Sequence, residues 1–214
     1  MTIKAKLYVA ILLTVIGPVI TIAVALHGMG RLGDRFAEVQ DRQDRRALAL
    51  DLKFGVTDFN GWQTAYGYDN GASRPRFVNS VRRFRADFAV AKRELTDAHP
   101  RRLLREIGVR FDRFMALDDV AYAALRRGDH ARVKQIFLGP ELRLFDEMAV
   151  RAEALARYEA RGAQATEKAF NDSREDSRRS LIAVGLGAAL VIVLLLVTAG
   201  DIARLAIEGH RVRQ

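Results

Sequence analysis

Residues 58–69 read DFNGWQTAYGYD and hold the single tryptophan of this 214-residue chain. The apolar positions that lead through this stretch recur at steps of four and three, which places them on one face of a helix. They are Leu48, Leu52, Gly55, Phe59, Trp62 and Tyr66. A face of this kind is typical of a helix that packs against other helices, and the glycine and proline of residues 70–75 are expected to end it.

The region from residue 30 to residue 180 shows the periodicity of helices almost throughout and no alternation typical of strands. We predict helices at residues 30–68, 76–98, 101–127 with a short piece at 131–138, and 140–180. His99-Pro100 is expected to end the second helix, and Gly139-Pro140 to separate the last two. Four amphipathic helices with short connections predict an all-α fold, an antiparallel four-helix bundle.

Each of the later helices has its own inward face. The predicted inward residues are Phe77, Val81, Phe84, Phe88, Ala91 and Leu95 in the second helix, Leu104, Ile107, Phe111, Phe114, Asp118, Ala121 and Leu125 in the third, and Ala149, Ala152, Ala156, Ala160 and Ala163 in the fourth. Small residues in the fourth helix would let its neighbours approach closely.

Two stretches without a charged residue, 7–26 and 181–199, flank the helical region. As helices they are about 30 Å long, which is the thickness of the hydrocarbon core of a bilayer. We predict transmembrane helices at residues 7–28 and 181–199, with an N-terminal segment at 1–6 and a tail at 200–214. A cleaved signal peptide is the alternative for the first stretch, because Lys4 and Lys6 precede it.

The composition argues against several kinds of site. The chain has no cysteine, so thiolate metal sites and disulfides are excluded. Its four histidines share no ligand spacing, and no glycine-rich phosphate loop or paired nucleophile and base is present. We therefore expect no enzyme activity, no metal and no cofactor. The net charge of +9 is concentrated between Arg74 and Arg113, a stretch that we interpret as a solvated face, with attraction of anions as the alternative.

Five residues are the candidates for ligand binding: Asn60, Trp62, Gln63, Tyr66 and Asp118. The first four would form a small-molecule site at one end of the bundle. In the alternative, Trp62 and Tyr66 fill the core, and Asn60 and Gln63 lie beside it. Asp118 interrupts an apolar face, so it should pair with an arginine or a tyrosine hydroxyl, lie near the surface, or contact a ligand.

The order of the segments resembles the sensor half of methyl-accepting chemotaxis receptors, which carry a four-helix-bundle ligand-binding domain between two membrane helices. Residues 58–66, 114–118 (FMALD) and 125–129 (LRRGD) are similar to segments of such domains, and the resemblance covers roughly residues 5–200. It implies an extracytoplasmic bundle, both termini in the cytoplasm, an inner-membrane location and a homodimer paired through the first helices. Nucleic acid is not an expected partner.

The chain departs from that family after the second predicted span, where only residues 200–214 follow. This is too short for the linker and signalling domains of a receptor. We expect a chemotaxis-like sensor that transmits helix displacement to a separate signalling protein. The alternatives are a membrane-anchored structural or adaptor protein without a ligand, and a split or truncated receptor.

Overall fold

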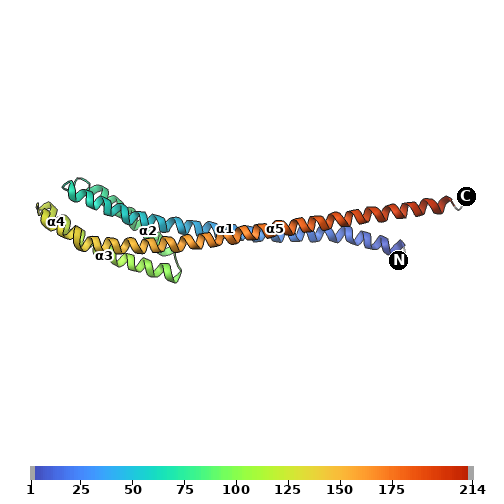
Figure 1. Cartoon of the computed structure of the whole chain (residues 1–214), viewed down its shortest axis with the longest axis horizontal. Coiled ribbons are helices and arrows are strands. Elements are labelled where there is room, and N and C mark those ends of the chain that lie inside the picture. Colours follow the sequence, from blue (N-terminus) through green and yellow to red (C-terminus); the bar gives the residue numbers. More distant parts are fainter. Residues whose placement is uncertain (1–2, 212–214) are drawn as a thin grey trace. The chain divides into compact units, whose positions relative to one another are not determined.

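The computed structural model describes residues 3–211, and side chains between residues 16 and 200 apart from Pro18, Leu194 and Thr198. Every element in this range is helical and none is a strand, which confirms the predicted all-α class (Figure 1). The elements are α1 (Ile3–Tyr68), α2 (Arg74–Glu94), α3 (Ala98–Arg126), α4 (His130–Ile136), the π-helical turn η1 (Phe137–Glu141) and α5 (Leu142–Arg211).

The chain divides into two compact units, and α1 and α5 contribute residues to both. The central unit is Glu38–Glu167, and the terminal unit comprises Met1–Ala37 with Lys168–Gln214. The predicted domain boundaries at residues 28–30 and 180–181 lie inside α1 and α5. These boundaries remain predictions.

An aromatic cluster forms the middle of the hydrophobic core in the central unit. The ring of Phe59 on α1 lies 5.2 Å from Phe84 on α2, and 5.6 Å and 5.3 Å from Phe111 and Phe114 on α3, measured between centroids. Met148, Leu155 and other side chains of α5 complete this core. The pairs with Phe84 and Phe111 are edge-to-face, and such pairs add to the free energy gained by burying apolar area.

On α1, half of the predicted inward face is correct. The buried residues are Ala49, Leu52, Val56, Phe59, Gln63 and Tyr66. Leu48, Gly55 and Trp62 were expected to be buried, but in each case the next residue is buried instead. These next residues are Ala49, Val56 and Gln63. Spacing alone permits both rows, because residues three and four positions away lie on the same side of a helix. At Gly55, an added Cβ would lie 3.0 Å from the Phe84 ring, so this position serves the close approach of α2.

The break between α2 and α3 differs from the expected one. The prediction placed it at His99-Pro100, but α2 ends at Glu94 and α3 begins at Ala98. Asp97 is the N-cap residue, with an extended backbone at φ −62° and ψ 149°. Pro100 therefore lies in the first turn of α3, where its missing N–H would have had no partner within the helix. All seven predicted inward residues of α3 are buried, as expected.

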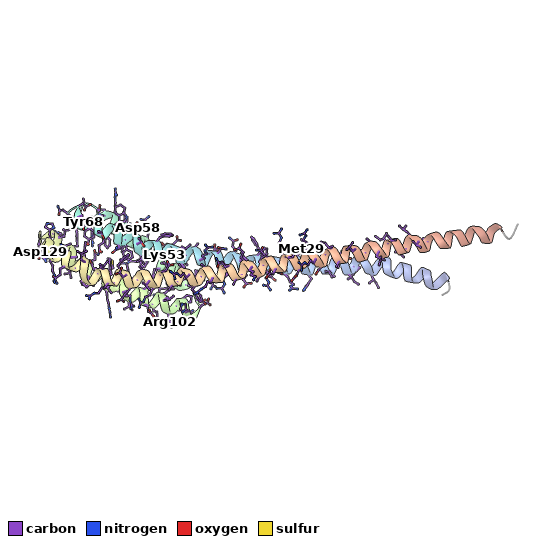
Figure 2. All side chains as sticks on the ribbon, in the orientation of Figure 1. Met29, Lys53, Asp58, Tyr68, Arg102 and Asp129 are labelled. Atoms are coloured by element: carbon purple, nitrogen blue, oxygen red, sulfur yellow. The ribbon has the colours of Figure 1, made fainter. Side chains whose placement is uncertain are left out.

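The two glycine-containing breaks after α3 behave differently. At the first break, Gly128 has φ +74°. Asp129, which is labelled in Figure 2, caps α4 by accepting a hydrogen bond from the N–H of Arg132 at 3.0 Å. At the second, the expected separation at Gly139-Pro140 is wrong, because the helix continues there as η1. A π-turn tolerates Pro140, which has no N–H to donate, because its wider hydrogen bonding already departs from the α-helical ladder.

On α5, the small inward residues Ala152, Ala156 and Ala163 are buried as predicted, whereas Ala149 and Ala160 are only half-buried. Larger side chains, Met148 and Leu155, are fully buried on the same helix. The close approach of helices expected from an alanine face therefore applies to part of α5 only.

The terminal unit exposes apolar side chains along both of its helices. Among the described residues, one helical run, His130–Val197, contains a stretch long and apolar enough to cross a membrane, with a mean hydropathy of 2.9 and none of that window buried. Leu186, Leu190 and Leu196 are among its exposed residues. Much of the first predicted span, including residues 7–15, lies outside the described side chains, so that span remains a prediction.

Candidate functional site

A polar cluster lies inside the core of the central unit, with Asp118 of α3 at its centre. Asp118 is completely buried. One of its oxygens, Oδ1, accepts a short hydrogen bond from the Tyr66 hydroxyl and another from Gln63 Nε2 at 3.2 Å. Its other oxygen pairs with a guanidinium nitrogen of Arg74 at 2.7 Å. The expected partners of Asp118, an arginine and a tyrosine hydroxyl, are thus both confirmed.

Glu141, the last residue of η1, brings a second carboxyl group into the cluster. It is 1% exposed, and its Oε1 accepts a hydrogen bond from Gln63 Nε2 at 2.9 Å. Its Oε2 has no hydrogen-bond partner among the described residues. The amide of Gln63 therefore bridges two carboxyl groups that belong to different helices.

Burial and charge act together on the titration of this cluster. Burial raises the pKa of Glu141 to about 8, and the negative charge of Asp118 acts in the same direction. The hydrogen bond from Gln63 and the charge of Arg74 oppose this rise. Burial, followed by the charge of Asp118, also raises the pKa of Tyr66, so its hydroxyl remains a donor to Asp118.

Arg74 supplies the positive charge of the cluster from within an aromatic cage. Its guanidinium carbon lies 4.8, 4.6 and 4.3 Å from the ring centroids of Tyr66, Phe77 and Tyr122. The Arg74 side chain is only 15% exposed. Cation–π contacts in such a desolvated place add to the ion pair with Asp118. The interpretation of the basic stretch as a solvated face therefore fails at its first residue.

The turn between α1 and α2 brings Arg74 to this position. Asn70 and Gly71 both have positive φ values, 55° and 93°, and the Gly71 N–H donates to the Tyr66 carbonyl at 2.8 Å. Pro75 then lies in the first turn of α2, where its fixed φ suits the start of a helix. This tight reversal holds Arg74, the first residue of α2, beside Tyr66.

The other side of the cluster depends on a close contact between α1 and η1. At Gly67, an added Cβ would lie 2.5 Å from Cε2 of Phe137, the first residue of η1. The same Phe137 ring lies 5.7 Å from the Tyr66 ring. Glycine at position 67 therefore lets η1 pack against α1, and this packing carries Glu141 to Gln63.

Of the five predicted site residues, the structure brings together Gln63, Tyr66 and Asp118. Trp62 is half-buried at the edge of the core, so the expectation that it fills the core is wrong. Its indole Nε1 donates to Asp58 at 3.1 Å, and the guanidinium of Arg76 lies 4.8 Å from its ring. The polar partners of Trp62 lie outside the core, whereas the next residue, Gln63, points into it.

Asn60 is half-buried and lies outside the cluster, and its backbone carbonyl accepts a hydrogen bond from the Thr64 hydroxyl at 3.0 Å. Two members of the cluster, Arg74 and Glu141, were missed by the sequence analysis. For Glu141 a signal exists, because it precedes the buried Met148 and Leu155 at heptad spacing. For Arg74 we find no such signal, since its place depends on the turn before it.

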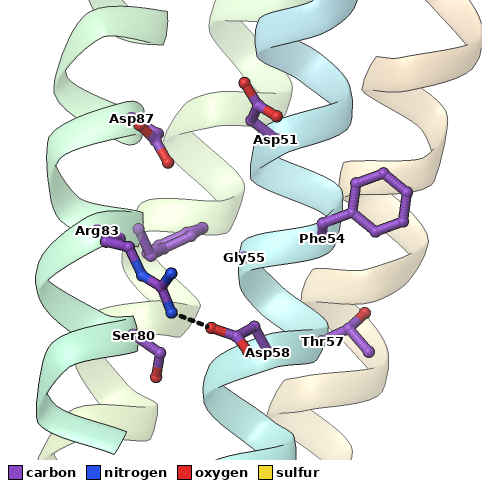
Figure 3. A pocket seen from close by; sticks show the side chains of 9 residues that line it. Asp51, Phe54, Gly55, Thr57, Asp58, Ser80, Arg83 and Asp87 are labelled. Atoms are coloured by element: carbon purple, nitrogen blue, oxygen red, sulfur yellow. Dashed lines mark hydrogen bonds and ion pairs between the residues drawn. The ribbon is translucent and has the colours of Figure 1, made fainter. Parts of the chain in front are cut away.

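A separate groove of about 460 Å³ lies between α1 and α2 (Figure 3). Asp51, Asp58 and Asp87 line it, and Arg83 reaches across from α2 to pair with Asp58 at 3.0 Å. The Arg83 side chain is largely exposed, so this ion pair is solvated and contributes little to stability. None of the five predicted ligand residues lines this groove.

Within the described residues, no three histidine, aspartate or glutamate side chains are grouped so that they could hold a metal ion. Comparison of the chain with protein-family models, with curated proteins and with solved structures found no match.

Proposed function

We propose that this chain is a membrane-anchored sensor, in which an extracytoplasmic antiparallel four-helix bundle lies between two transmembrane helices. The helices α1, α2, α3 and α5 all contribute to the one hydrophobic core of the central unit, and this supports the bundle. The exposed leucines of residues 181–197 support a membrane span, because lipid is the solvent in which such a surface is stable.

The observation that carries the sensor proposal is the buried polar cluster of Gln63, Tyr66, Arg74, Asp118 and Glu141. A protein with a well-packed apolar core is usually at least as stable as one with a buried group of charges in the same place. Stability alone therefore does not account for this cluster. Buried groups with shifted pKa values concentrate at functional sites. The cluster joins α1, α2, α3 and η1, and a ligand or other stimulus acting there would change how these helices pack.

The route for the signal is the helix that follows the cluster. α5 begins directly after Glu141 and continues as a helix to Arg211, through the apolar stretch that we assign to the membrane. A small displacement of α5 between two packings of similar energy would carry a change across the membrane. A separate signalling protein would read this displacement at the inner surface.

We further propose a homodimer paired through α1, as the resemblance to chemoreceptor sensor domains implies. Leu32 and Val39 are half-buried. Phe36 between them has its ring 6.3 Å from that of Phe170 on α5, yet it is 58% exposed and leaves part of an apolar side chain available for a second copy. Single cysteines at positions 32, 36 and 39 test this pairing in membranes, since the natural chain contains none. We expect the strongest cross-link at position 36, and monomers at every position would contradict the dimer.

Ligand sensing is tested by thermal unfolding of the full chain in detergent with a panel of amino acids, organic acids and amines. A sensor predicts that at least one compound raises the unfolding temperature, because only binding to the folded state does so. The shift should disappear in Gln63→Ala and persist in the matched control Asn60→Ala, which changes a nearby residue outside the cluster. A panel without any shift would favour the adaptor.

A further inference from the structure

The polar cluster contains two carboxyl groups but one cation. Gln63 Nε2 donates to Asp118 at 3.2 Å and to Glu141 at 2.9 Å, so both groups lie within reach of a single amide. The guanidinium of Arg74 is paired with Asp118. Glu141 has the Gln63 amide as its hydrogen-bond donor, and its Oε2 has none among the described residues. The cluster is therefore one positive charge short of neutrality when both acids are ionised.

Two buried carboxyl groups in one site do not ionise together, because the second negative charge meets both desolvation and repulsion from the first. Asp118 is the better stabilised anion, since Tyr66, Gln63 and Arg74 all donate hydrogen bonds to it. The groups that act on Glu141 by charge are Asp118 from α3, which disfavours its ionised form, and Arg74 from α2, which favours it. Tyr66 from α1 stays a neutral hydroxyl, because burial raises its pKa.

We propose that Glu141 carries a proton at neutral pH, and that loss of this proton at mildly alkaline pH loosens the junction between η1 and α5. The central unit thereby responds directly to proton concentration. This inference goes beyond the proposed function, because proton release is a property of the folded chain whether or not that chain is a sensor.

The position of Glu141 explains why its ionisation would act on η1. It is the last residue of a π-turn that holds Pro140, and the helix there lacks the regular hydrogen-bond ladder. An ionised Glu141 needs donors or water, and the cluster offers it only the amide shared with Asp118. Movement of this carboxylate towards solvent would displace η1 and the first turn of α5, because both adjoin Glu141 in the chain.

The direction of the pH effect follows from linkage. The pKa of Glu141 rises from its ordinary 4.5 to about 8 on folding, so between these values the folded chain binds more protons than the unfolded chain. The contribution of Glu141 to stability is therefore complete below pH 4.5 and is lost as pH rises to about 8. Above that pH both states are ionised, and the contribution changes no further.

The first test is infrared spectroscopy of the full chain in detergent micelles, with ¹³C-labelled glutamate carboxyl groups. Subtracting the spectrum of Glu141→Gln from that of the wild type isolates the Glu141 carboxyl group. We expect its protonated band at neutral pH and its loss near pH 8. The matched control, Glu159→Gln, removes another buried acid and should retain this transition. A Glu141 carboxyl group already ionised at pH 6, about two units below the expected transition, would overturn the proposal.

The second test follows hydrogen exchange of the amides at residues 137–145 in the wild type and in Glu141→Gln at matched pH. Because the two proteins are compared at the same pH, the intrinsic pH dependence of amide exchange cancels. Faster exchange in the wild type above the transition, with equal exchange below it, supports the loosening of η1. Equal exchange at all pH values would show that η1 does not respond, and would overturn that part of the proposal.

Asp118→Asn provides a further variant that does not depend on the folding of Glu141→Gln. Removing the negative charge of Asp118 should move the titration of Glu141 to lower pH, because that charge raises its pKa. In the labelled glutamate spectrum, the band lost near pH 8 should then be lost at a lower pH. An unchanged titration would show that the two acids do not share a site.

Discussion

Two places in the central unit bury a glutamate, and the two differ in what surrounds the carboxyl group. Glu141 and Glu159 are each 1% exposed. Glu141 accepts a hydrogen bond from Gln63, whereas both carboxyl oxygens of Glu159 have no hydrogen-bond partner in the described part of the chain. Burial raises the pKa of Glu159, and the nearby charges of Arg42 and Arg45 lower it only in part.

The arginines near Glu159 are engaged elsewhere. Arg45 pairs with Asp41 at 2.9 Å, and both Arg42 and Arg45 lie within 4 Å of Asp97, at 3.6 and 3.8 Å. The two sites thus show that burial of an acid does not by itself create a network. Donors must approach the carboxyl group in bonding geometry, as they do around Asp118, before several helices are tied together through it.

The largest expected difference between the two sites comes from truncating their acids. Asp118→Ala leaves the Arg74 guanidinium and the Tyr66 hydroxyl without their partner, and should lower the free energy of unfolding by about 3–5 kcal/mol. Glu159→Ala removes a carboxyl group without hydrogen bonds and should lower it by less than half as much. Denaturant unfolding of the full chain in micelles measures both, and equal losses would contradict the distinction.

Removal of a single hydroxyl sharpens the same comparison. Tyr66→Phe deletes one donor to Asp118 and should lower the free energy of unfolding by about 1–2 kcal/mol, because the acceptor remains buried. Tyr158→Phe is the matched control, since Tyr158 is half-buried beside His99 and next to Glu159 in the chain. The control should change stability by less than about 0.5 kcal/mol. A larger loss of stability in Tyr158→Phe than in Tyr66→Phe would show that the stabilising network lies near Glu159.

Glu159→Gln should have a small effect, a gain of about 0–1 kcal/mol at neutral pH, because it removes a buried ionisable group whose oxygens lack hydrogen bonds. Since burial raises the pKa of Glu159, the stability it contributes falls as pH rises above the ordinary value of 4.5. The gain in free energy of unfolding from Glu159→Gln should therefore grow as pH rises above 4.5. Stability curves of wild type and variant that stay parallel from acid to neutral pH would contradict it.

Trp62→Phe should also have a small effect, a loss of about 0.5–1 kcal/mol, since the indole is half-buried and gives up one hydrogen bond to Asp58 and a contact with Arg76. The titration of Glu141 should stay unchanged in this variant, because Trp62 lies outside the polar cluster. A loss of stability as large as that of Asp118→Ala would show that the Trp62 side chain is buried in the core.

Much of the fold follows from the sequence alone because helical periodicity is a local property. The end of α1 at Tyr68, the inward face of α3 and the break between α3 and α4 follow from apolar spacing and from glycine. The need of Asp118 for a partner also follows, since an isolated buried charge is unstable in any fold. The choice between Trp62 and Gln63 as the inward residue does not, because both positions satisfy the same period.

Tertiary structure decided which residues meet. Gln63 enters the core because α3 and η1 present carboxyl groups to it, and these segments lie 55 and 78 residues away in the chain. Arg74 becomes buried because the turn at Gly71 places it in a cage whose third ring, Tyr122, comes from α3. Gly139-Pro140 continues the helix because η1 packs against α1 at Gly67. Each outcome depends on groups distant in sequence, which local spacing does not encode.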